Sequence, residues 1–87
     1  MKNYHPKSWS QQAREMGDTG VYNVNNGYWP IERAVEYFSF GSYRHWRVRR
    51  RAAKRFGRLV RNHKVHEHPE SLVYWKQYKE EYGGYVR

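Results

Sequence analysis

The segment that decides the fold of this 87-residue chain is Tyr43–Lys64, which reads YRHWRVRRRAAKRFGRLVRNHK. It holds ten Lys or Arg residues and no Asp or Glu. The whole chain has 17 basic and 8 acidic residues, so the rest of the sequence carries seven basic residues against eight acidic ones. The net charge of +9 therefore comes from this one segment.

The apolar and basic residues of this segment separate when they are placed on an α-helix. Seven apolar side chains share one arc and eight cations share the other, which predicts an amphipathic helix that buries its apolar arc and presents a cationic stripe. Such a helix would be about 33 Å long. The apolar arc holds Trp46, Val48, Ala52, Ala53, Phe56, Leu59 and Val60, and the cationic arc holds Arg44, Arg47, Arg50, Arg51, Lys54, Arg55, Arg58 and Arg61.

Three residues of the segment fit the two arcs less well. His45 and Arg49 fall among the apolar positions. An inward arginine needs a carboxylate partner, and Glu32 or Glu36 would provide one because both lie on the preceding predicted helix. Gly57 lies at the edge of the apolar arc and costs about 1 kcal/mol relative to Ala in a helix. We interpret it as a position of close helix approach.

The first 29 residues predict a short helix followed by a turn. Ser8 would cap the helix and Gly17 would end it. Residues 21–29 contain the turn signal Asn25-Asn26-Gly27 between short apolar stretches, which predicts a turn or a short β-hairpin.

Two further helices follow from apolar spacing. A helix over Pro30–Ser39 would bury Ile31, Ala34, Val35 and Phe38, and Ser42 would cap the basic helix after it. A last helix from Pro69 to Tyr82 would end at Gly83 and bury Leu72, Trp75, Tyr78 and Tyr82. The sequence thus predicts one mostly α domain over residues 1–87, with three or four helices and a core rich in its 16 aromatic residues.

Several functional classes are not favoured by the composition. No apolar run approaches 18 residues, and the chain starts without the apolar segment of a signal peptide, so we expect neither a membrane span nor secretion. The absence of Cys fits a reducing compartment such as the cytoplasm. Neither a glycine-rich phosphate loop nor a thiol nucleophile is present, and His63, His66 and His68 lack the spacing of the usual zinc motifs. We therefore expect no enzyme activity, no cofactor and no metal.

Nucleic-acid binding is the function that the cationic stripe favours. Phosphates would neutralise a one-sided face of arginines, which suit planar and bidentate contacts. The Pro30–Ser39 helix and the basic helix have the outline of a helix-turn-helix, so DNA is slightly favoured over RNA. In an RNA-binding mode, spare aromatic residues would stack on bases. The candidates are Tyr4, Tyr22, Tyr28, Tyr43, Tyr74 and Tyr85.

A protein-interaction or inhibitor module is the alternative. The basic face would then enter an acidic groove of a partner protein, and exposed aromatic residues beside the stripe would add contact area. Small phage-encoded inhibitors and virion or ribosome accessory proteins have compositions of this kind. The sequence leaves the oligomeric state open.

Overall fold

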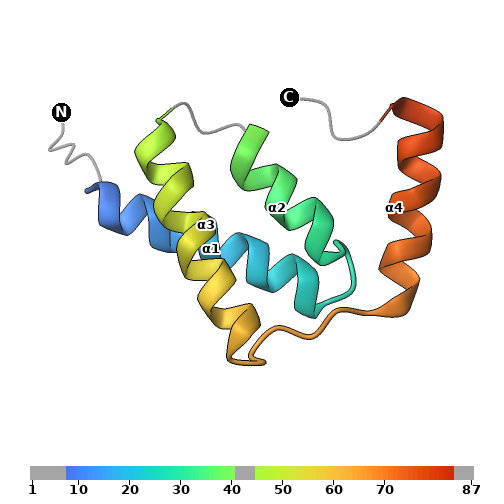
Figure 1. Ribbon diagram of the computed structural model, residues 1–87, viewed down its shortest axis with the longest axis horizontal. Helices are drawn as coiled ribbons and strands as arrows, with labels where there is room; N and C mark the ends of the chain where they lie inside the picture. The colour runs from blue at the N-terminus through green and yellow to red at the C-terminus, as the bar shows by residue number, and fades with distance from the viewer. Residues whose placement is uncertain (1–7, 41–44, 84–87) are drawn as a thin grey trace, which may run out of the picture.

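The computed structural model describes residues 8–40 and 45–83, and it is mostly helical (Figure 1). The four helices are α1 (Trp9–Asn25), α2 (Ile31–Phe40), α3 (Trp46–Arg61) and α4 (Pro69–Tyr82). No strand occurs in the described ranges. The predicted small all-α fold is therefore confirmed, and the β-hairpin near residues 21–29 is wrong.

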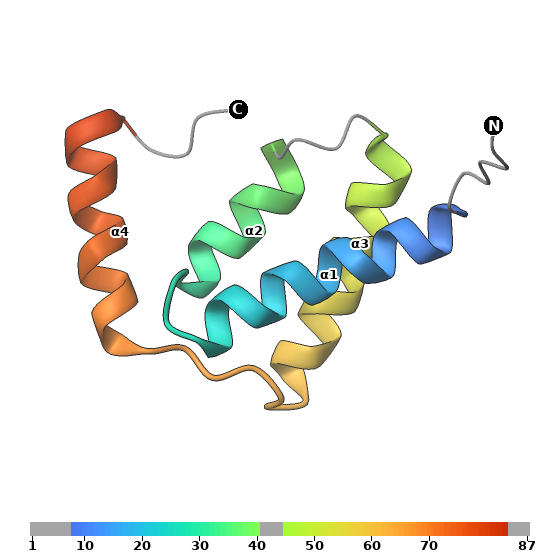
Figure 2. The same cartoon turned by 180° about the vertical axis from the view of Figure 1, so that it is seen from behind.

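Helices α1, α2 and α3 form a three-helix unit around one apolar core. Figures 1 and 2 show from both sides that α1 crosses α3 and that α2 lies next to this crossing. The rings of Phe38 on α2 and Phe56 on α3 lie 5.3 Å apart between their centroids at the centre of the unit. The buried cluster comprises Ala13, Met16, Val24, Ala34, Phe38, Val48, Ala52, Phe56 and Val65.

Two phenylalanines supply the aromatic part of this core. The described tyrosines are half-buried or exposed, so the expected aromatic-rich core is wrong in its extent. Tyrosine and tryptophan carry a polar O–H or N–H that needs a partner when it is buried, which favours the rim of a small domain over its centre.

Helix α1 continues through Gly17, where the sequence predicted its end, and through Gly20. Gly17 and Gly20 are both buried inside the helix. A Cβ atom on Gly20 would lie 2.6 Å from Cζ of Phe38, and one on Gly17 would lie 3.1 Å from Cδ of Arg55. These glycines allow neighbouring helices to approach closely, so tertiary packing outweighs their poor helix propensity.

The Asn-Asn-Gly signal marks the end of α1. Residues up to Asn25 are helical, and Asn26 forms the C-cap. Gly27 adopts a positive φ of 81°, a conformation that glycine reaches without a steric penalty. The backbone N–H groups of Tyr28 and Trp29 then donate to the carbonyl oxygen of Asn23 at 2.9 and 3.0 Å. The turn was thus predicted at the right place, but it leads into a second helix and not into a second strand.

The inward face of α2 is narrower than its apolar spacing predicted. Ala34 and Phe38 are buried and Ile31 is half-buried, but Val35 is 49% exposed. The backbone N–H of Ile31 donates to Oε2 of Glu67 at 2.7 Å, so a side chain from the connector before α4 satisfies one free donor at the start of this helix.

Helix α3 begins later than the sequence predicted. His45 is its N-cap, and Nδ1 of the imidazole accepts a 3.3 Å bond from the backbone N–H of Arg47. The residue expected as the cap, Ser42, lies outside the described residues. The apolar arc is confirmed at its centre, since Val48, Ala52 and Phe56 are buried and Leu59 and Val60 pack against the core. Trp46 and Ala53, at the edges of the arc, are exposed.

Helix α4 has the predicted bounds, and Gly83 ends it with a φ of 78°. The predicted apolar stripe is confirmed at two of its four positions and wrong at the other two. Trp75 is buried and Tyr78 half-buried, whereas Leu72 and Tyr82 are exposed. The helix lies at one end of the molecule in both views, so it has only a small surface to pack against (Figures 1 and 2).

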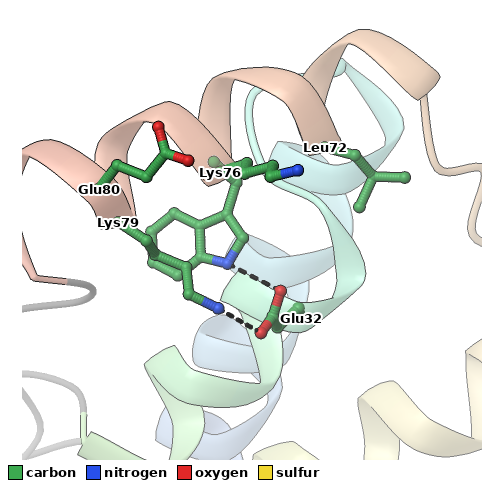
Figure 3. A pocket seen from close by; sticks show the side chains of 6 residues that line it. Glu32, Leu72, Lys76, Lys79 and Glu80 are labelled. Carbon is green, nitrogen blue, oxygen red and sulfur yellow. Dashed lines mark hydrogen bonds and ion pairs between the residues drawn. The ribbon is translucent and has the colours of Figure 1, made fainter.

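Polar and cation–π contacts hold α4 to α2. The carboxylate of Glu32 accepts from Nε1 of Trp75 at 3.0 Å and from Nζ of Lys79 at 2.7 Å (Figure 3). The bond from Glu32 raises the pKa of the Lys79 ammonium above its ordinary value. The guanidinium carbon of Arg33 lies 5.0, 5.4 and 5.6 Å from the ring centroids of Trp29, Trp75 and Tyr78.

The glycine environments predict opposite effects of the same substitution at two positions. Gly57 was predicted to be a position of close helix approach, and this prediction is wrong. A Cβ atom there would meet only Nη1 of Arg61, at 3.6 Å, so no other helix approaches it closely, and α3 continues through it. Gly57→Ala should raise the free energy of unfolding by about 0.5–1 kcal/mol through helix propensity. Gly20→Ala should lower it by about 1–3 kcal/mol, because Phe38 must move. Urea unfolding followed by circular dichroism measures both, and equal signs would contradict the packing at Gly20.

Candidate nucleic-acid interface

The outer face of α3 carries a row of exposed cations that follow one another at helical spacings of three or four residues. Such spacing places side chains on one face of the helix. All five members are exposed, and we call them the cationic ridge: Arg47, Arg50, Lys54, Arg58 and Arg61.

The predicted stripe contains a second row, which is turned toward α1. Nη1 of Arg51 donates to Oγ of Ser10 at 3.1 Å. Nη2 of Arg55 lies 3.0 Å from Oδ1 of Asp18. Arg55 is half-buried and its stem packs over Gly17. Arg55 was expected on the open stripe, but it instead joins α3 to α1 by an ion pair and by packing of its stem.

Two other sequence expectations also concern arginines of this region. Arg44 lies outside the described residues. Arg49 is half-buried, which agrees with its place on the apolar arc. Glu32, one of the two carboxylates proposed as its partner, is bonded to Trp75 and Lys79 on α4.

The cationic ridge has no carboxylate partner in residues 8–40 and 45–83. Helix α3 contains no acidic residue, and Asp18 on the adjacent helix is bonded to Arg55. Like charges at helical spacings of three and four repel each other and lower the stability of a helix. An anionic ligand would reduce this repulsion. Binding of a polyanion along the ridge would therefore stabilise α3.

A shallow hollow lies at the start of the ridge. It has a volume of about 310 Å³ and is lined by Trp46, Arg47, Arg50, Arg51 and Lys54. Four of these five side chains carry a positive charge and the fifth is an exposed indole. The hollow can therefore receive a phosphate next to a flat apolar or aromatic group.

Sequence reasoning missed three residues beside this face. Trp46 is 54% exposed and Trp9 is 39% exposed, and the guanidinium carbon of Arg47 lies 5.5 and 5.0 Å from their ring centroids. Arg14 is exposed on α1, one turn from Ser10 and one turn from Asp18, in the row that contacts α3. The charge pattern of α1 could have indicated Arg14 only if the pairing of α1 with α3 had been known.

The tyrosines that were considered as stacking platforms do not gather on α3. Tyr22 and Tyr28 are exposed at the far end of α1, with their ring centroids 6.3 Å apart, and Tyr74 is exposed on α4. Tyr4, Tyr43 and Tyr85 lie outside the described residues. Among the described residues, the exposed aromatic side chains beside the ridge are Trp9 and Trp46.

Two of the three histidines considered as metal ligands contact Asn25 at the end of α1. The backbone N–H of His66 donates to Oδ1 of Asn25 at 2.6 Å, and Nε2 of His68 lies 2.7 Å from the carbonyl oxygen of Asn25. His63 has a positive φ of 60° in the turn after α3. Within the described residues, no group of three potential metal ligands comes together.

Comparisons of the chain with protein-family models, with curated proteins and with solved structures found no match. Among the described helices, none combines the length and the apolar character that crossing a bilayer requires. The surface of α3 is therefore the feature from which a function can be inferred.

The two rows of α3 predict different responses to truncation. Arg55→Ala should lower the free energy of unfolding by about 0.5–1.5 kcal/mol, because it removes the ion pair with Asp18 and the stem that packs over Gly17. Arg58→Ala, one turn further along the exposed ridge, should change it by less than about 0.5 kcal/mol. Chemical unfolding of both variants tests this, and an equal loss at the two positions would contradict the division into two rows.

Proposed function

We propose that this protein is a small non-enzymatic nucleic-acid-binding protein that docks the cationic ridge of α3 on phosphates, with duplex DNA slightly favoured over RNA. The observation that carries the proposal is the ridge itself, which presents five exposed cations on one helix face with no acidic partner among the described residues. Nucleic acids are the polyanions whose charge density matches such a surface.

The dimensions of the ridge fit a short stretch of duplex. From Arg47 to Arg61 the helix rises about 21 Å. An α-helix fits the major groove of B-form DNA, which is about 12 Å wide, and the duplex carries one negative charge per about 1.7 Å of its axis. The ridge can therefore meet a phosphate at each of its five cations, which is why we favour a duplex as the partner.

The residue types of the ridge favour binding with little sequence preference. Four of its five members are arginine and none is Asn or Gln, the residues that pair with adenine in the major groove. Phosphate contacts fix the register of a protein on a duplex but carry no sequence information. Arginine can also pair with guanine, so a mild preference for G·C-rich DNA is compatible with this surface.

The salt dependence of binding provides the test. If five phosphates are engaged, the logarithm of the association constant for a blunt DNA duplex should fall with the logarithm of salt concentration at a slope of about −4.5. The double variant Arg50→Ala/Arg58→Ala should reduce the magnitude of this slope by about 2, because each ridge cation contributes one phosphate contact. Fluorescence anisotropy of a labelled duplex over a series of KCl concentrations measures the slope.

A control with the same net charge separates the ridge from overall charge. Lys76→Glu on α4 lowers the net charge of +9 by two, as the double ridge variant does, but Lys76 is exposed on the helix at the end of the molecule. It should leave the slope near that of the unsubstituted protein. Equal effects of the two variants would indicate diffuse attraction, and no binding at low salt would contradict the proposal.

A protein partner is the second candidate, and one observation favours it. An apolar groove of about 340 Å³ between α2 and α3 is lined by Val35, Phe38, Phe56 and Val60, with Arg61 among its walls. Apolar residues beside a cation suit an amphipathic segment that carries leucines and a carboxylate. This reading assigns the ridge to an acidic surface of a partner protein.

A synthetic helical peptide with one leucine face and flanking glutamates probes this second candidate. The unsubstituted protein should bind it, and Val35→Asp should weaken that binding at least tenfold because a carboxylate would enter the apolar groove. The same variant should leave duplex binding within about threefold, since Val35 lies outside the ridge. If the peptide fails to bind the unsubstituted protein, the groove is no such site.

A further inference from the structure

Four flat groups contact one another in succession where α1 meets the start of α3, and we call them the aromatic column. The imidazole of His45 and the indole of Trp9 lie 4.3 Å apart between their ring centroids. The guanidinium carbon of Arg47 lies 5.0 Å from the centroid of Trp9 and 5.5 Å from that of Trp46. The column therefore runs from imidazole to indole to guanidinium to indole, and Trp46 is its last member.

The Trp46 end of the column is open. Trp46 is 54% exposed, although exposing so large an aromatic side chain forfeits much of the free energy that its burial would supply. The same indole lines the hollow that contains Arg47, Arg50, Arg51 and Lys54. A flat aromatic surface and a cluster of cations thus face one space.

We propose that Trp46 is a stacking platform for an unpaired nucleobase, so that the ligand this protein prefers is a duplex with a single-stranded extension. This inference rests on the proposed function and specifies its substrate. The duplex lies along the ridge, and the first unpaired base stacks on the Trp46 indole. Its phosphate is received by Arg47, Arg50 and Lys54, the cations of the hollow that belong to the ridge.

The requirement for an unpaired base follows from the chemistry of stacking. The faces of bases inside a duplex are already covered by their neighbours, whereas an unpaired base has a free π-face. Every base has such a face, so a tryptophan platform accepts all four without reading the sequence. This agrees with a ridge that lacks Asn and Gln.

The size of the hollow limits the number of nucleotides. A volume of about 310 Å³ lies at the lower end of the range for small-ligand sites, about 300–1,000 Å³. The hollow suits one nucleotide at a time. A short extension of the duplex should therefore bind as tightly as a long one.

Three labelled DNA probes test the inference at one fixed salt concentration. The first is a blunt duplex, the second is the same duplex with a three-nucleotide single-stranded extension, and the third carries three abasic nucleotides in that extension. The second and third probes are each made in two forms, with the extension at the 5′ end or at the 3′ end of one strand. One orientation of the second probe should bind about 5- to 150-fold more tightly than the blunt duplex, the range for stacking of one base. The third probe should show at most a threefold gain, because it adds phosphates without bases.

Variants of the platform give an independent readout. Trp46→Ala should remove the preference for the extended duplex and leave binding of the blunt duplex within about twofold. Trp46→Tyr should retain part of the preference, since a smaller aromatic ring still stacks. Tyr74→Ala is the matched control, because Tyr74 is 68% exposed on α4 and should have no effect on any probe.

The outcomes separate this inference from the proposed function. Equal affinity for the blunt and extended duplexes, or for the base-containing and abasic extensions, would overturn the stacking site while leaving ridge binding intact. The comparison of probes needs no variant, so it holds even if a Trp46 substitution fails to fold. If none of the probes binds at low salt, both the stacking site and the proposed function are wrong.

Discussion

The burial of one narrow arc of α3 is the constraint on which the rest of the structure depends. This helix has so many cations that only Val48, Ala52 and Phe56 enter the core fully. Helices α1 and α2 must therefore pack closely around that arc. Gly17 lets α1 approach α3 at Ala52 and Arg55, and Gly20 lets Phe38 of α2 pass close to α1. Because the apolar arc faces inward, the opposite face is necessarily cationic and exposed. The fold and the candidate interface are two consequences of the same amphipathic pattern.

The sequence predicted the elements whose signals are local. The period of α3, the start of α4 at Pro69 and its end at Gly83 follow from apolar spacing and from residues with fixed conformational preferences, and the structure confirms them. Gly17 was predicted to end the first helix but lies inside α1. A glycine can end a helix, but it can also allow another helix to cross closely. The hairpin near residues 21–29 was wrong because α1 continues through Gly17 and Gly20 as far as Asn25. Local sequence cannot show which neighbour a glycine will meet.

The candidate site was predicted in outline, but the sequence did not show which of its cations contact α1 and which stay exposed. Helical periodicity placed eight cations on one arc, but it could not distinguish Arg58 from Arg55. Only the pairing of α3 with α1 brings Asp18 to Arg55 and Ser10 to Arg51. Trp9 belongs to the site for the same reason, because it lies far from Arg47 in the sequence and contacts it only across the helix crossing. Contacts between helices decide which cations bind within the protein and which remain for a partner.

The aromatic column makes the two ends of the ridge different, because it lies at one end only. Five cations at regular spacing would allow a duplex to lie along α3 in either sense, because phosphates repeat along both strands. Trp46 lies at one end of the ridge, and the hollow beside it is lined by Arg47, Arg50, Arg51 and Lys54. Arg58 and Arg61, further along the ridge, do not line this hollow. An unpaired base can thus be received at one end alone, and this asymmetry would orient a nucleic acid on the protein without any reading of its sequence.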